Sequence, residues 1–228
     1  MLAVSVVVLG DAPQSASAAV LAAAEQTGKA TSLRMVSQLP TTDSQGKPLK
    51  DRLTMTGEVD GADFTFVHRS EPSGDTLTVT VIGDVRYHGR AEGNFSEKIP
   101  AEQRRAPFAE AARNVFRTAV EASDTKEIGT EKVRGVDTTH YRLTVKSSAG
   151  STDQVHPLAK LPATELDWFG VASFLKKPQA KADVIIDLWV ADGLIRRSDF
   201  TVPVEHWKQS NEYFDFDKPI TITPPAGS

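Results

Sequence analysis

The sequence predicts an α+β fold, in which one strongly curved antiparallel sheet forms a half-open β-barrel and helices cover its concave face. Apolar and polar residues alternate with a period of two along most of the chain, which is typical of half-buried antiparallel strands. Tight-turn pairs such as Asp60-Gly61 and Asp192-Gly193 join consecutive strands. Three segments with helical periodicity interrupt the strands, and each has an apolar stripe to bury against the sheet.

An alanine-rich helix is expected first, over residues 13–27, with Pro13 in its first turn and Gly28 as its C-cap. A second helix is predicted over residues 102–123, with Pro107 in its first turn or separating a short leading piece. A third is predicted over residues 164–176, with Thr164 as its N-cap. The predicted strands span residues 32–39, 52–59, 63–66, 76–81, 85–87, 127–133, 138–145, 182–191, 194–204 and 210–217.

The N-terminal residues 1–12 are almost wholly apolar and are expected to be the remnant of a signal peptide or a flexible N-terminus. A short strand through Val4, Val6 and Val8 is the alternative. Residues 13–225 are expected to form a single domain. The chain has no cysteine, which excludes disulfides, a cysteine nucleophile and membrane anchoring through a lipid-modified cysteine.

No motif for catalysis or cofactor binding is present. The five histidines form no i, i+4 pair, and the chain has neither a G-x-S-x-G elbow nor a phosphate-binding glycine loop. We therefore expect no enzyme activity, no cofactor and no metal. The net charge of −4, without a basic stripe, argues against a nucleic-acid partner. The doublets Arg104-Arg105 and Arg196-Arg197 are expected to be solvated, with contact to a lipid headgroup as the alternative.

The sequence has a surplus of apolar side chains around the third helix. Leu166, Trp168, Phe169, Phe174 and Leu175 cover most of the circumference of residues 164–176. A helix that is apolar on nearly all sides is either deeply buried or borders a second apolar volume. From the residues alone, a packed core and a lipid cavity both remain open.

Three segments resemble actinobacterial lipoproteins of the LppX/LprG type. They are residues 129–145 (GTEKVRGVDTTHYRLTV), 188–197 (LWVADGLIRR) and 213–225 (YFDFDKPITITPP). The order of elements resembles that family over residues 13–225, and the family shares the fold of the carrier LolA and the stress sensor RseB. The resemblance implies that Gly135 occupies a tight turn and that Tyr141 points inward.

The resemblance also implies a secreted or extracytoplasmic, non-enzymatic protein that binds and transports lipid or lipoglycan in the cell envelope through an apolar cavity. Its expected partners are an acyl lipid or glycolipid and a membrane surface or transporter, and the protein is expected to be a monomer. An RseB-like sensor module and a structural envelope domain with a filled core are the alternatives. The residues expected to line the cavity are Leu33, Met35, Leu53, Met55, Phe64, Phe66, Val79, Val81, Phe116, Tyr141, Leu143, Trp168, Phe169, Phe174, Ile186, Leu188 and Phe214, with residues 164–176 as a lid.

Overall fold

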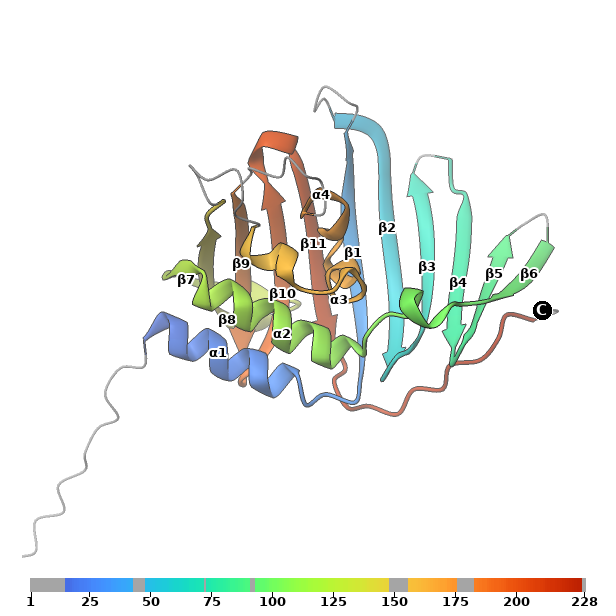
Figure 1. Ribbon diagram of the computed structural model, residues 1–228, viewed down its shortest axis with the longest axis horizontal. Helices are drawn as coiled ribbons and strands as arrows, with labels where there is room; N and C mark the ends of the chain where they lie inside the picture. Colours follow the sequence, from blue (N-terminus) through green and yellow to red (C-terminus); the bar gives the residue numbers. More distant parts are fainter. Residues whose placement is uncertain are drawn as a thin grey trace, which may run out of the picture.

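The computed structural model describes residues 15–42, 48–71, 73–90, 93–147, 156–175 and 183–226 (Figure 1). Its strands form one 11-stranded antiparallel sheet in the order β6-β5-β4-β3-β2-β1-β11-β10-β9-β8-β7. β6 and β7 are the two edges, so the sheet is not closed into a barrel. The strands are β1 (Ser32–Thr42), β2 (Pro48–Asp60), β3 (Asp63–Glu71), β4 (Thr76–Ile82), β5 (Val85–Arg90), β6 (Gly93–Lys98), β7 (Ser123–Val133), β8 (Val136–Val145), β9 (Val184–Ala191), β10 (Leu194–Val202) and β11 (Trp207–Phe214).

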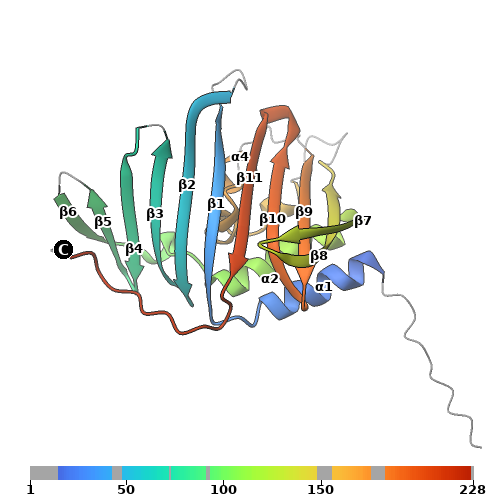
Figure 2. The same ribbon diagram turned by 180° about the vertical axis from the view of Figure 1, so that it is seen from behind.

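The helices lie on one face of the sheet, as Figures 1 and 2 show from opposite sides. α1 and α2 run side by side across the strands, and α2 buries one stripe that includes Phe108, Ala112 and Phe116. A chain of short helices lies above them. The helices are α1 (Ala16–Thr27), η1 (Ala101–Gln103), α2 (Phe108–Glu121), η2 (Pro157–Lys160), α3 (Ala163–Leu166), η3 (Asp167–Phe169), α4 (Ala172–Leu175) and η4 (Pro203–Glu205).

The predicted fold class is confirmed, and most predicted elements lie where the periodicity places them. α1 is capped by Ser15, whose side chain accepts a hydrogen bond from the amide of Ala18, and it ends at Gly28 as predicted. Pro107 directly precedes α2 and separates it from η1, which confirms the short leading piece. Gly135 has a positive φ in the β7–β8 turn, as the resemblance implies. Residues 1–14, with the predicted signal-peptide remnant and Pro13, lie outside the described residues.

Two predictions of elements are wrong. The third helix is not continuous. α3 passes directly into the 3-10 turn η3, and Gly170, in a left-handed conformation (φ 68°), ends η3 before α4. Pro162, and not Thr164, is the N-cap of α3. Strand β6 was not predicted, since all of its residues are exposed and it has little apolar alternation.

The sheet departs from a plain curved layer at the β7–β8 hairpin. A register shift between Glu127 and Gly129 bends β7, and the hairpin folds across the outer face of the sheet (Figure 2). At its tip, the Arg134 guanidinium lies 4.0 Å from the ring centroid of Phe214 and 3.4 Å from the Glu212 carboxylate. This half of the sheet is therefore covered on both faces, by helices on one and by its own hairpin on the other.

The other half of the sheet is less covered. The segment that joins β6 to α2 crosses the lower ends of β3 to β5, and the upper ends extend beyond it (Figure 1). On the outer side, residues 218–226 run along the ends of the strands toward β6 (Figure 2), where the Asn94 side-chain amide donates to the Ala226 carbonyl at 2.7 Å. The concave face of β2 to β5 is therefore the place where the apolar interior approaches solvent.

Candidate functional site

Most of the residues predicted to line a cavity lie together on the concave face. Pairing partners across an antiparallel sheet share a face, so the pairs Phe64–Val81, Phe66–Val79 and Leu188–Tyr141 place their side chains on the helix-covered side. The predicted residues buried in this common core are Leu33, Met35, Met55, Phe64, Phe66, Val81, Phe116, Tyr141, Leu143, Trp168, Phe169, Ile186 and Leu188, with Val79 packed against them. The inward orientation of Tyr141 agrees with the resemblance.

Three of the predicted residues do not join this group. Leu53 lines a pocket beside the core. Phe214 lies on the outer face, where Arg134 covers its ring, because its neighbour Tyr213 takes the inward position in the period-two pattern of β11. The side chain of Phe174 lies outside the described residues. Phe214 is therefore not part of the concave lining.

An aromatic cluster fills the centre of the concave face. The Trp168 ring lies 5.3 Å from Phe64, 5.8 Å from Phe66 and 5.5 Å from Phe108 between centroids, in edge-to-face geometry each time. The indole N–H of Trp168 donates to the Ala106 carbonyl at 2.8 Å, which satisfies the only polar group of the side chain. Under α3 and η3 the described side chains thus form a packed core.

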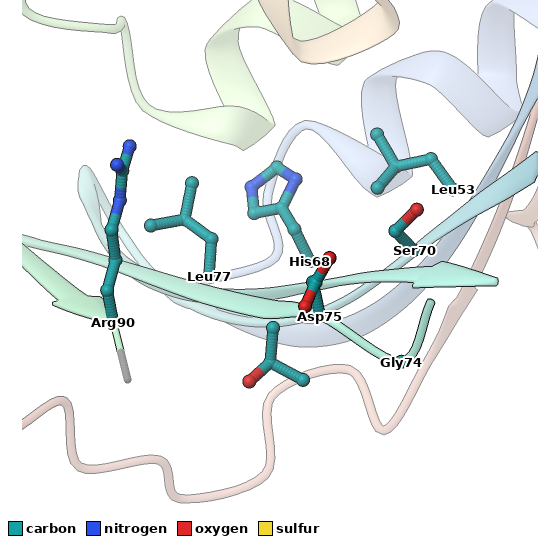
Figure 3. Close-up of a pocket in the computed structure, with 8 residues that line it drawn as sticks. Leu53, His68, Ser70, Gly74, Asp75, Leu77 and Arg90 are labelled. Carbon is teal, nitrogen blue, oxygen red and sulfur yellow. The ribbon is translucent and has the colours of Figure 1, made fainter. Parts of the chain in front are cut away.

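A pocket opens beside this core, at the upper ends of β2 to β5 (Figure 3). Its volume is about 500 Å³. It is lined by apolar and polar side chains from adjacent strands, and Figure 3 shows His68, Leu77 and Arg90 side by side, projecting to the same side of the sheet. The lining residues are Leu53, His68, Ser70, Gly74, Asp75, Thr76, Leu77 and Arg90.

Sequence reasoning placed only Leu53 of these residues in the binding site. The period-two pattern held the signal for two others. His68 follows Phe64 and Phe66 on one face of β3, and Leu77 precedes Val79 and Val81 on one face of β4. Arg90 had no such signal, because its position depends on how far β5 extends beyond residue 87.

A basic side chain, Arg105, lies over the aromatic cluster. The half-buried Arg105 guanidinium lies 5.0 Å from the Trp168 ring centroid and 5.3 Å from that of Phe64. Burial lowers the pKa of Arg105, and burial together with the Arg105 charge lowers the pKa of His68. The expectation that Arg105 is solvated is therefore wrong, whereas its neighbour Arg104 is exposed and 3.6 Å from Asp84.

A second polar group lies on the outer face, beneath the β7–β8 hairpin. His140 stacks on Trp189 with centroids 4.3 Å apart, and its Nε2 lies 2.9 Å from the buried Asp187 carboxylate. Arg142 donates two hydrogen bonds to Asp187, at 2.7 and 3.1 Å. His140, Asp187 and Arg142 are thus partnered within the sheet, whereas the buried indole N–H of Trp189 has no hydrogen-bond partner among the described residues. The ion pairs and the ring stacking explain how the hairpin is held. Within the described part of the chain, no group of three or more histidine and carboxylate side chains is arranged to hold a metal ion.

Comparison with known proteins identifies the fold. No family model matches the chain, and no curated protein matches it either. Among solved structures, the lipoprotein LppX of Mycobacterium tuberculosis superposes with a TM-score of 0.58 at 14% identity, covering 93% of this chain and all of that one. LprF of Mycobacterium bovis gives 0.60 at 13% identity, covering 93% and 97%. This chain has the LppX-type fold.

The LppX-type fold accounts for the arrangement of the site. Helices cover one half of the concave face of the open sheet (Figure 1), and the pocket lies on the other half (Figure 3). None of the helices in the described ranges is long and apolar enough to cross a bilayer.

Proposed function

We propose that this protein is a non-enzymatic lipid carrier of the extracytoplasmic cell envelope, which binds acyl chains on the concave face of its sheet as a monomer. The observation that carries the proposal is an apolar surface that continues from the core into the pocket. Across β3 and β4, the packed pair Phe66–Val79 is followed by His68–Leu77, which lines the pocket. An acyl chain that enters the pocket beside Leu77 would therefore reach the apolar side chains of the core.

The energetics suit a reversible carrier. Each buried methylene contributes about 0.8 kcal/mol, so ten methylenes contribute roughly 8 kcal/mol before the cost of immobilising the ligand. A volume of about 500 Å³ lies within the range of small-ligand pockets. Capture and release of one acyl chain would then need no covalent chemistry, in accord with the resemblance to LppX/LprG-type lipoproteins.

A lipid with several acyl chains needs more space than the pocket offers. We propose that the segment from η2 to α4 supplies it by lifting from the sheet, so that the predicted residues beneath it become the lining. Two features favour this segment as the moving part. It consists of short helices divided at Gly170, and two buried polar atoms on it, His156 Nε2 and Glu165 Oε2, have no hydrogen-bond partner.

Native mass spectrometry of the purified protein, with extraction and analysis of co-purified lipid, tests the proposal. Titration with a fluorescent fatty acid then measures the affinity of the pocket for an acyl chain. Leu77→Asp should weaken uptake about tenfold or more, since it replaces apolar surface of the pocket with a carboxylate that the acyl chain would have to desolvate. Val67→Asp, at an exposed position on the opposite face of neighbouring β3, is the matched control and should bind normally. Absence of both co-purified lipid and uptake would refute the proposal.

A further inference from the structure

Two arginines at the pocket and the aromatic cluster beside it have no ion-pair partner among the described residues, although Asp75 lines the pocket and the charge of Asp167 acts on Arg105. Arg90 lines the pocket, and within the described residues its guanidinium forms no ion pair. Arg105 also lacks an ion pair or a hydrogen bond to any described side chain, although it is half-buried over the rings of Phe64, Phe66 and Trp168. A guanidinium withdrawn from water in this way is a site for an anion, because cation–π contacts leave its five N–H donors free.

His68 belongs both to the pocket lining and to the edge of the aromatic cluster. It lines the pocket, its ring centroid lies 6.5 Å from that of Phe66, and Arg105 lies over the Phe66 ring. The lowered pKa of His68 keeps its ring neutral, so it offers one donor and one acceptor. Ser70, which also lines the pocket, adds a hydroxyl donor. Arg86 and Arg104 are not available in the same way, since Glu97 and Asp84 pair with them.

We propose that this pocket binds the phosphate of a lipid headgroup, with Arg90, His68 and Ser70 of its lining around the phosphate. Arg105 adds positive charge from the neighbouring aromatic cluster, and the acyl chain lies on the adjoining apolar surface. The proposal rests on the proposed lipid binding and names the class of lipid. Arginine is suited to this task because its planar donors match phosphate oxygens in pairs. Asp75 is the one carboxylate among the described lining residues, and its negative charge repels an anion in the pocket.

Two lipids that differ only in the phosphate test the proposal. Oleoyl lysophosphatidic acid and monooleoylglycerol share one acyl chain and a glycerol, and their dissociation constants are compared by titration calorimetry. We expect the phosphate-bearing lipid to bind about tenfold more tightly, as charge-assisted hydrogen bonds do. Arg90→Gln and Arg105→Gln should each reduce this preference, and Asp75→Asn should increase it. Arg69→Gln, one residue from His68 but on the opposite face of β3, should leave it unchanged.

Each outcome separates this proposal from the lipid carrier. Equal binding of the two lipids would overturn the phosphate site and leave lipid binding intact, whereas binding of neither would refute both. If both glutamine variants are folded, as judged by circular dichroism, and keep the preference, then these arginines do not contribute to phosphate binding. Inorganic phosphate serves as the third probe, and displacement of lysophosphatidic acid by equimolar inorganic phosphate would overturn the assignment to a lipid headgroup.

Discussion

The Phe66 ring lies directly over Gly57, its pairing partner on the neighbouring strand. A β-carbon at Gly57 would overlap two atoms of this ring, so glycine is required for the ring to lie flat against the sheet. From this position Phe66 packs edge to face against Trp168. It also packs against His68, which lines the pocket. The backbone of β2 thus determines where the aromatic cluster sits.

Gly57→Ala should destabilise the protein by about 1–3 kcal/mol, because the ring has to move within a packed core. Chemical denaturation monitored by tryptophan fluorescence measures the change. Gly89→Ala is the matched control, since a β-carbon there has no neighbour closer than 3.4 Å and should cost little. Equal stability of the two variants would show that Phe66 does not depend on Gly57.

Glu165 should make stability fall as pH rises. Burial raises the pKa of this carboxyl, and one of its oxygens has no hydrogen-bond partner. The folded state therefore binds the proton more tightly than the unfolded state, and the resulting stability is present below the ordinary glutamate pKa and is lost as pH rises through the raised value. Glu165→Gln should flatten this part of a thermal-unfolding series over pH. A variant with the same slope as the wild type would contradict the assignment.

Asp199 should have the opposite effect. Burial alone would raise its pKa, but hydrogen bonds from Arg197, Lys208 and Ser210 outweigh burial and lower the pKa. Stability from this group is therefore present above the ordinary aspartate pKa and is lost as pH falls through the lowered value. Asp199→Asn should cost about 2 kcal/mol at neutral pH, measured by urea denaturation, because charged hydrogen bonds are lost. An unchanged midpoint of urea unfolding would contradict this, since it would mean that Arg197, Lys208 and Ser210 find other hydrogen-bond partners.

The fold was largely predictable from the sequence, because period-two alternation specifies which side of each strand is buried. The alternation of Phe64, Phe66, Val79 and Val81 predicts that these residues share one face, and they lie together on the concave face. Strand β6 was missed because an exposed edge strand needs no apolar alternation. The break of the third helix depends on Gly170, which faces the Gln209 side chain from a distant strand, and such a tertiary contact leaves no local pattern.

The candidate site was less predictable than the fold. Apolar periodicity identifies what is buried, and it does not distinguish a filled core from a cavity wall. Phe214 illustrates this limit of apolar periodicity. Tyr213, Phe214 and Phe216 put aromatic residues on both faces of the chain, so the pattern alone does not orient them. The register of β11 with β1 determines that Phe214 points outward. The pocket itself depends on Leu53, Leu77 and Arg90 from three strands, whose juxtaposition requires the full sheet.

The most direct test of the account is the quenching of single tryptophans by a brominated fatty acid. A variant with Trp189→Phe and Trp207→Phe keeps only Trp168, on the concave face, whereas Trp168→Phe with Trp207→Phe keeps only Trp189, beneath the hairpin on the outer face. The account predicts saturable quenching of Trp168 and none of Trp189, with the unbrominated acid as the control. Equal quenching of both residues, or of neither while the lipid binds, would contradict a binding site on the concave face.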